Sequence, residues 1–221
     1  MKIIDAHSHI DYITHNYQSD VVRTICCATN ESEWDKLTDM ITRDKNIYGA
    51  FGVHPWFVDE AQFGFEKRLY DLLQSNDDFM VGEIGLDKFK PNMDNQIDVF
   101  CRQMNIAVEL NRTVFLHCVG AWDKILHILK SYKKLPAIVA HDFNGSIDIL
   151  NTLIKNYDIM FSLHRINADL IGATPIDKIM VETDGKNNII LQDIIDKISI
   201  IKNEPDANDI IYKNTQRILN K

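Results

Sequence analysis

The pentapeptide Asp5-Ala6-His7-Ser8-His9 lies near the start of the sequence, directly after the β-compatible segment Lys2–Ile4. Side chains alternate between the two faces of an extended strand, so His7 and His9 are expected to project from the same side. Neutral imidazole is a common ligand of divalent transition metals, and the pair therefore predicts part of a metal site. Two histidines at this spacing are equally compatible with a plain surface location, and the rest of the chain decides between the two interpretations.

Seven further β-rich segments follow, most of them apolar without alternation, which is typical of parallel strands buried on both faces. They are separated by amphipathic segments of helical periodicity. The predicted strands cover residues 2–4, 21–28, 47–53, 79–84, 113–117, 137–141, 159–163 and 179–182. This alternation predicts an α/β fold, a (β/α)8 TIM barrel. The connection between the last two strands is short, so one outer helix there is expected to be degenerate.

Length and composition indicate a single domain over residues 1–221, with 45% hydrophobic and 25% charged residues. No apolar run approaches the ~20 residues of a membrane helix. The four cysteines show no CxxC spacing and the N-terminal residues show no signal peptide, so we expect reduced thiols and a cytoplasmic location. A net charge of −8 argues against extensive duplex binding, although a compact site for a small anionic substrate remains compatible with it. No feature indicates an obligate protein partner.

Side chains of metal-ligand type recur at or near the ends of the predicted strands, where catalytic groups of a TIM barrel gather. These side chains are His7, His9, His54, Glu83, His117, His141 and Asp184. Each one alone is more often a rim residue or a cap, but their expected co-location favours a metal site. His15 and His127 lack this context and are expected at the surface, whereas the sequence leaves His164 open.

Several motifs, in order along nearly the whole chain, resemble the TatD family of metal-dependent hydrolases, within the amidohydrolase-type barrel superfamily. The motifs are DAHSHID, GVHP, VGEIGLD, a strand ending in LH, H-x-F-x-G, VETD and NTQRIL. The resemblance implies two divalent ions and a TIM barrel. It assigns one ion to His7, His9 and Asp184, the other to His117 and His141, and a bridging position to Glu83.

Such a pair of ions stabilises both the attacking and the leaving oxygen of a displacement and lowers the pKa of coordinated water from 15.7 toward ~7. Asp184 is predicted to orient that water and to accept its proton, which makes Asp184 and Glu83 the predicted catalytic residues. Mixed histidine and carboxylate ligands suit Zn²⁺, Mn²⁺, Fe²⁺ and, less well, Mg²⁺. The identity of the metal therefore stays open.

The substrate side of the predicted site departs from the family pattern. An arginine is missing after His117, Lys88-Phe89 replaces an aromatic pair, and Gly185-Lys186 replaces Ser-Pro. His54 matches a family position that faces the site, so we predict that it contacts substrate or phosphate; the alternative is a strand-end residue fixed by Pro55. Lys88 is the second predicted substrate-binding residue. Four basic residues follow strand ends and predict positive charge at the site's mouth, unless they are solvated loop residues: Lys88, Lys90, Arg165 and Lys186.

Together these features predict a metal-dependent hydrolase, a nuclease of the deoxyribonuclease type that cleaves phosphodiester bonds of DNA or short oligonucleotides. The alternative is hydrolysis of a small amide, ester or phosphoester on the same barrel. Amide-type relatives often bridge their metals with a modified lysine after the fourth strand, whereas this chain has Glu83 there, which favours the phosphodiester. A non-catalytic metal-binding barrel would have lost a ligand, and none of the expected set is missing.

Overall fold

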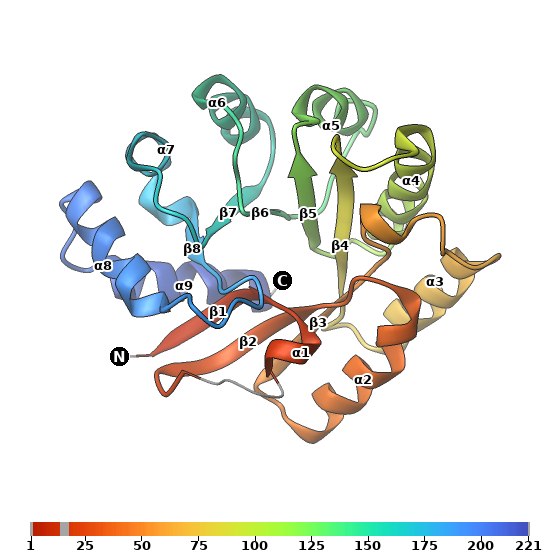
Figure 1. Ribbon diagram of the computed structural model, residues 1–221, viewed down its shortest axis with the longest axis horizontal. Coiled ribbons are helices and arrows are strands. Elements are labelled where there is room, and N and C mark those ends of the chain that lie inside the picture. Colours follow the sequence, from red (N-terminus) through yellow and green to blue (C-terminus); the bar gives the residue numbers. More distant parts are fainter. Residues whose placement is uncertain (1, 14–17, 221) are drawn as a thin grey trace.

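The chain forms a barrel of parallel strands in the computed structural model, which describes residues 2–13 and 18–220 (Figure 1). Within that part of the chain, eight strands form one sheet in sequential order, and each paired neighbour runs parallel. The strands are β1 Ile3–Ser8, β2 Val21–Cys27, β3 Ile47–Phe51, β4 Met80–Asp87, β5 Val114–Val119, β6 Ile138–His141, β7 Ile159–Leu163 and β8 Ile179–Val181. The predicted (β/α)8 architecture is confirmed.

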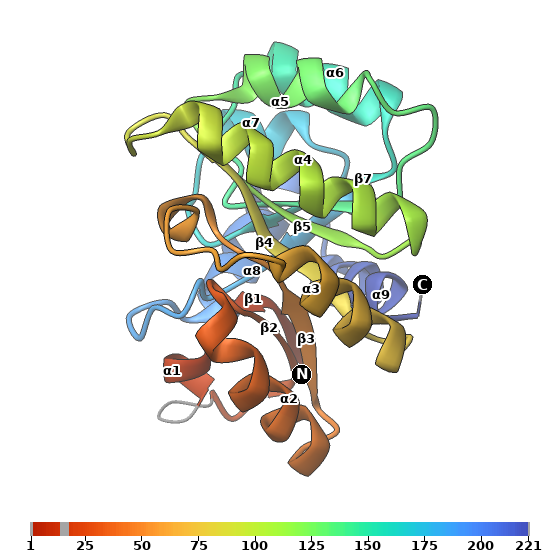
Figure 2. The same cartoon turned by 90° about the vertical axis from the view of Figure 1, so that its right-hand side faces the viewer.

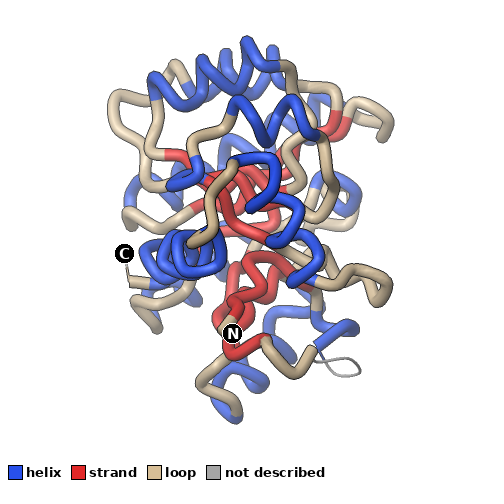
Figure 3. Tube along the Cα trace, turned by 90° about the vertical axis from the view of Figure 1, so that its left-hand side faces the viewer, coloured by secondary structure: helices blue, strands red, loops and turns tan. Residues whose placement is uncertain are grey.

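Helices surround the strands on the outside, as Figures 1 and 3 show. The α-helices are α1 Ile10–Ile13, α2 Trp34–Arg43, α3 Phe65–Ser75, α4 Met93–Glu109, α5 Trp122–Leu129, α6 Ile147–Asn156, α7 Ala168–Ala173, α8 Leu191–Lys202 and α9 Ala207–Leu219. Short 3₁₀ turns are η1 Glu31–Glu33, η2 Pro55–Phe57 and η3 Ile176–Lys178. The six-residue α7 is the degenerate outer helix that the short connection predicts. None of the described helices has the length and apolar character needed to span a bilayer.

Side-chain and backbone bonds join the first and last strands. The buried Asp5 carboxylate accepts hydrogen bonds from the Thr183 N–H (2.9 Å) and the Thr183 hydroxyl (2.6 Å). One step further along, the Asp184 N–H donates to the His7 carbonyl at 2.9 Å. These bonds place the end of β1 beside the residues that follow β8.

Two apolar layers hold the barrel together. Alternate strand residues belong to different clusters: Phe115 and Val139 pack in a smaller cluster, whereas Val114 and Ile138, their sequence neighbours, belong to the larger one. Because strand side chains alternate between faces, the smaller cluster fills the barrel interior and the larger one lies between strands and helices. Apolar residues on both faces explain why the strand segments lack alternation in the sequence.

Strand β4 differs from its predicted extent. The sequence predicts a strand that ends at Ile84, just after Glu83, but β4 continues to Asp87. Its pairing with β5 is irregular between Val81 and Ile84 and then regular as far as Asp87. Glu83 therefore projects from an irregular point within a strand, a position that is common beside active sites.

Gly85 allows the close approach of β4 and β5 next to the site. Its φ is +151°, and a Cβ atom built there would lie 1.8 Å from the His117 carbonyl oxygen. We therefore expect Gly85→Ala to lower the free energy of unfolding by roughly 2–3 kcal/mol, at the upper end of overpacking effects. Urea denaturation measures the change. The matched control is Gly172→Ala, because a Cβ at that glycine meets no atom within 4 Å; an equal loss in both variants would contradict the explanation.

Candidate metal centre

The seven predicted site residues of metal-ligand type converge at the carboxyl ends of the strands. His7 belongs to β1, Glu83 to β4 and His117 to β5, while His141 is the last residue of β6. Of the other three, His9 directly follows β1, whereas His54 and Asp184 lie in the loops after β3 and β8. All are buried except His9 and Asp184, which are partly exposed. The packing of parallel strands thus brings together groups that lie far apart in the sequence.

The Glu83 carboxylate lies at the centre of the cluster. Its Oε1 is 2.7 Å from His117 Nδ1, and 3.4 and 3.7 Å from the Nε2 atoms of His54 and His141. Its Oε2 is 3.2 Å from His7 Nε2 and 3.8 Å from His9 Nε2. Burial alone would raise the pKa of this carboxyl, but the surrounding histidines lower it well below its usual value. Each oxygen of Glu83 therefore faces a different group of imidazoles.

Asp184 forms the second acidic side of the cluster. Its Oδ1 lies 3.4 Å from His9 Nε2, 3.6 Å from His141 Nε2 and 3.9 Å from His7 Nε2, while Oδ2 pairs with the Lys186 ammonium. Burial would raise the pKa of Asp184, but the hydrogen bond from His9 and the neighbouring charges lower it overall. The carboxylate is thus ionised and presents one oxygen to the histidines.

Second partners fix the orientation of three histidines. His9 Nδ1 lies 3.0 Å from the Cys27 carbonyl oxygen. His7 Nδ1 lies 3.4 Å from the thiol sulfur of the same cysteine. His141 Nδ1 lies 2.8 Å from Glu182 Oε1. Each of these rings consequently turns its Nε2 toward Glu83 and Asp184, which is the usual arrangement of metal-ligating histidines.

Glu182 is a site residue that the sequence did not identify. It is fully buried, accepts a hydrogen bond from the Ser162 hydroxyl and lies 3.3 Å from His164 Nδ1. Although burial opposes the charged form, Glu182 and Glu83 raise the pKa of His141 to about 10. His164, whose position the sequence left open, therefore belongs to the buried support of His141. His127 is exposed as predicted, and His15 lies outside the described residues.

The cluster fits a divalent cation. The buried His7 Nε2 lies close to Glu83 Oε2 but not in hydrogen-bonding geometry, and it has no other hydrogen-bond partner among residues 2–13 and 18–220. The raised pKa of His141 shows that the surrounding carboxylates favour a positive charge at this point. Unpartnered imidazole nitrogens that face paired carboxylates are the donor set expected for transition metals.

Potential ligand atoms fall into overlapping groups, in each of which all atoms lie within 4.8 Å of one another. The groups at the centre are His7, His9 and Glu83; His7, His141 and Asp184; and His54, Glu83 and His117. His141 thus lies nearer to the first predicted ion position than its assignment to His117 suggests, and His54 lies beside His117. The predicted division of ligands between two ions stays a prediction.

A further group, Asp142, His164 and Glu182, lies beside the centre. His164 Nε2 is 3.0 Å from the Lys186 ammonium and 3.2 Å from the Arg165 guanidinium. Two cations next to the same imidazole oppose binding of a metal ion there. We interpret this group as support for His141 and Asp184.

The four basic residues predicted at the mouth have different surroundings. Lys88 and Lys90 are exposed in the β4–α4 loop. Arg165 pairs with Asp142, and Lys186 pairs with Asp184. Lys88 and Lys90 are therefore the two of the four whose ammonium groups are in no ion pair with the described residues.

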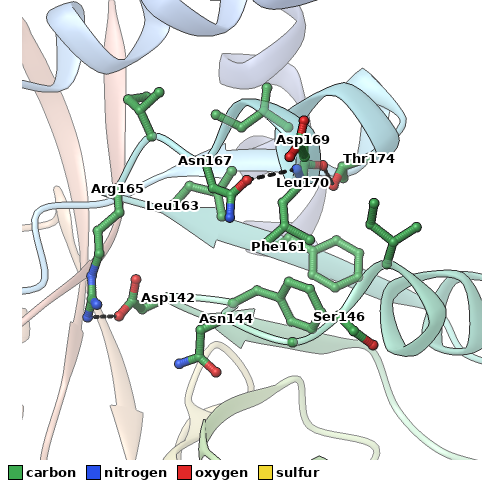
Figure 4. Close-up of a pocket in the computed structure, with 15 residues that line it drawn as sticks. Asp142, Asn144, Ser146, Phe161, Leu163, Arg165, Asn167, Asp169, Leu170 and Thr174 are labelled. Carbon is green, nitrogen blue, oxygen red and sulfur yellow. Dashed lines mark hydrogen bonds and ion pairs between the residues drawn. The ribbon is translucent and has the colours of Figure 1, made fainter.

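A cavity of about 500 Å³ lies between the β6–α6 and β7–α7 loops. Figure 4 shows the Asp142–Arg165 pair at one end of it, Asn144 and Asn167 on opposite walls, and Phe161 and Leu163 behind them. Asn167 caps α7 by accepting from the Leu170 N–H. The cavity adjoins the metal centre through Asp142, which directly follows His141.

A (β/α)8 barrel with histidines and carboxylates gathered at the carboxyl ends of its strands belongs to the class of metal-dependent barrel hydrolases. The model of the TatD related DNase family matches residues 4–220, and the chain belongs to that family.

Two curated relatives illustrate the similarity. The 3'-5' ssDNA/RNA exonuclease TatD of Escherichia coli is 26% identical over 208 residues, covering 88% of this chain and 79% of the relative. An uncharacterized metal-dependent hydrolase of Methanocaldococcus jannaschii is 27% identical over 245 residues, covering 97% and 96%. Both relatives are named as hydrolytic enzymes. The second is also named as metal-dependent, which agrees with the donor set of the centre.

A solved structure shares the fold. The crystal structure of YJJV, a TatD homologue from Escherichia coli, superposes with a TM-score of 0.87 at 21% identity and covers 99% of this chain and 98% of that one. An adenine deaminase structure has a TM-score of 0.72 at 16% identity, covering 99% and 71%. At these identities the similarity supports the barrel and carries no information on substrate.

Proposed function

We propose that this chain is a two-metal nuclease that hydrolyses phosphodiester bonds of DNA or short oligonucleotides. The observation that carries the proposal is the position of Glu83, whose two oxygens face different groups of histidines. In the proposal, His7, His9 and Asp184 would hold one divalent ion, His117 and His141 would hold the other, and Glu83 would be shared by both. Residues 1–221 act as a single cytoplasmic domain in this proposal.

With divalent ions bound, the site would gain Lewis acidity toward the phosphodiester and an attacking water. The chain supplies the proton acceptor, Asp184, one of whose oxygens faces the histidines while the other pairs with Lys186. Lys186 keeps Asp184 ionised and therefore able to accept a proton. His54, whose Nε2 lies 3.4 Å from Glu83, is proposed to contact the substrate phosphate. Metal analysis of His54→Ala tests this role, because loss of bound metal would make His54 a ligand instead.

The substrate class follows from family membership and from the carboxylate bridge. Relatives are named as nucleases that act on single-stranded DNA or RNA, including the exonuclease of Escherichia coli. We propose that nucleic-acid ends reach the centre in single-stranded form, because a chain of net charge −8 is poorly suited to extended contact with a duplex.

The decisive experiment compares substrates on metal-loaded protein: a single-stranded oligonucleotide, a phosphomonoester and an acyl ester. We expect hydrolysis of the oligonucleotide, its loss after chelation and its return when Mn²⁺, Zn²⁺ or Mg²⁺ is added separately. Metal should also raise the unfolding temperature, since a ligand at 100 times its Kd stabilises the folded state by about 2.7 kcal/mol. Turnover of the acyl ester alone would favour the small-substrate alternative, and activity that survives chelation would contradict the proposal.

A further inference from the structure

Trp56 presents a large exposed aromatic surface beside the metal centre. Its side chain is 52% exposed. Its backbone N–H donates to His54 Nδ1 at 3.2 Å, and its indole N–H donates to Asp87 Oδ2 at 2.7 Å. The ring centroids of Trp56 and His54 are 5.2 Å apart. The indole is thus fixed in position next to a residue of the cluster, although packing of the core does not require it there.

Exposed residues of the β4–α4 loop extend this surface. The Lys90 ammonium lies 4.0 Å from the centre of the Trp56 ring, and Phe89 is 79% exposed. The Phe89 N–H donates to Asp87 Oδ1 at 2.8 Å, so the Asp87 carboxylate holds both aromatic residues. Lys88 is exposed in the same loop. We call Trp56, Lys88, Phe89 and Lys90 the aromatic rim.

The loops that follow β3 and β4 lie side by side, at the left of Figure 2. Asn95 Nδ2 donates to Asp59 Oδ1 at 2.7 Å, which ties the start of α4 to the segment after η2. Asp87 also approaches the cluster, since its Oδ2 lies 3.9 Å from His117 Nε2. The aromatic rim therefore adjoins the metal centre through Asp87.

Exposed aromatic rings next to lysines are the chemistry with which proteins bind single-stranded nucleic acid: bases stack on the rings and ammonium groups pair with phosphates. We propose that the aromatic rim binds single-stranded nucleic acid, with one base stacked on Trp56 and neighbouring phosphates paired with Lys88 and Lys90. This inference rests on the proposed nuclease function for the placement of the strand at the centre. In an otherwise acidic protein, two lysines that form no ion pair with any described residue give the nucleic-acid strand a preferred path at this point.

The test measures binding to chelated, metal-free protein, so that turnover does not interfere. Fluorescence anisotropy with a labelled oligodeoxythymidine should give an affinity about tenfold weaker for Trp56→Ala, the scale of one lost base–aromatic stack. Trp56→Phe keeps a ring but loses the bond to Asp87, and should bind within about threefold of wild type. Near-normal affinity of Trp56→Phe would show that the aromatic ring, and not the bond to Asp87, is needed for binding. Unchanged metal content in both variants would show that the centre is intact.

The chain offers matched controls. Phe63 is fully exposed outside the rim, so Phe63→Ala should leave binding unchanged. The double variant Lys88→Gln, Lys90→Gln should make the plot of log association constant against log salt concentration less steep. The slope should decrease in magnitude by about 1.4, at about 0.7 per phosphate contact on a single strand. The control pair is Lys133→Gln with Lys134→Gln, two exposed lysines before β6.

The outcomes separate this inference from the proposed function. Binding that depends on Trp56 without any hydrolysis would support the aromatic rim and contradict the nuclease. Hydrolysis and binding that are unaffected in Trp56→Ala would overturn the rim while leaving the nuclease in place. Three other results would also overturn the aromatic rim. One is a loss of affinity in Phe63→Ala as large as that in Trp56→Ala, and another is an affinity for duplex DNA equal to that for the single strand. The third is a loss of affinity in Asn144→Ala, in the cavity of Figure 4, without any loss in Trp56→Ala.

Discussion

Replacement of Glu83 by glutamine is expected to remove most of the bound metal and nearly all turnover while the barrel stays folded. The side chain is 2% exposed, and its oxygens lie 2.7 Å from His117 Nδ1 and 3.2 Å from His7 Nε2. A neutral amide has one carbonyl oxygen and no charge, so it cannot bridge two cations. The strand itself is held by its apolar neighbours, Val81, Ile84 and Leu86.

Elemental analysis of metal per chain, circular dichroism and turnover of an oligonucleotide check this expectation together. Glu60→Gln is the matched control, because it makes the same chemical change at an exposed position outside the cluster. Full metal content in an inactive Glu83→Gln protein would exclude Glu83 as the bridge. An unfolded variant would show instead that removing the buried charge from among the histidines destabilises the chain, as breaking a buried pair can do at a cost of about 3–5 kcal/mol.

The sequence predicts that the side chains of the centre lie close together, because parallel strands of a barrel end at one face. A polar residue after an apolar strand is therefore placed by topology alone, and the rule correctly gathers His7, His54, His117, His141 and Asp184. The rule does not give the arrangement of the side chains within that face. It does not say which histidine faces which oxygen, and the proximity of His141 to Asp184 was not evident from its strand.

The supporting residues escaped prediction for a different reason. Asp5 and Glu182 are part of the motifs, yet their roles depend on partners that are distant in sequence: Thr183 for Asp5, and His141 with Ser162 for Glu182. A buried carboxylate next to a ligand is indistinguishable, in one sequence, from a ligand. The signal that could have identified them is their place inside strands or next to strand ends that are otherwise fully apolar, where an acidic side chain requires a partner.

The capping residues at the start of α2 are of the expected type, but they bond to different backbone groups from those that the sequence pattern indicates. The sequence Asn30-Glu31-Ser32-Glu33 is typical of a helix start at which Asn30 caps the helix and Glu33 is its capping-box partner. Asn30 instead caps η1 by accepting from the Ser32 N–H at 3.0 Å, and Glu33 accepts from the Thr29 N–H at 2.6 Å, one residue earlier than the box requires. The 3₁₀ turn inserted before α2 causes the shift, because it moves the first free N–H groups toward the N-terminus.

Asp184→Asn is expected to lower kcat at least about a hundredfold, since assistance by a general base contributes 10²–10⁴-fold, or roughly 3–5 kcal/mol. Asparagine keeps the size and one oxygen but loses the charge and the basic oxygen. It also breaks the ion pair with Lys186 and weakens the attraction to His9, whose Nε2 lies 3.4 Å from Asp184 Oδ1. Metal held by His117, His141 and Glu83 should stay bound, so metal content should fall by at most one ion.

Lys186→Gln separates the two roles of Asp184. It leaves the carboxylate in place but removes the ammonium group that helps to keep the pKa of Asp184 low. If Asp184 accepts the proton, the lysine variant should retain metal and bind substrate, and its kcat should stay well above that of Asp184→Asn, because the carboxylate that takes the proton is still present. A loss of only a few-fold in kcat for Asp184→Asn, with full metal content, would mean that the ions alone activate the water and that Asp184 is only a ligand.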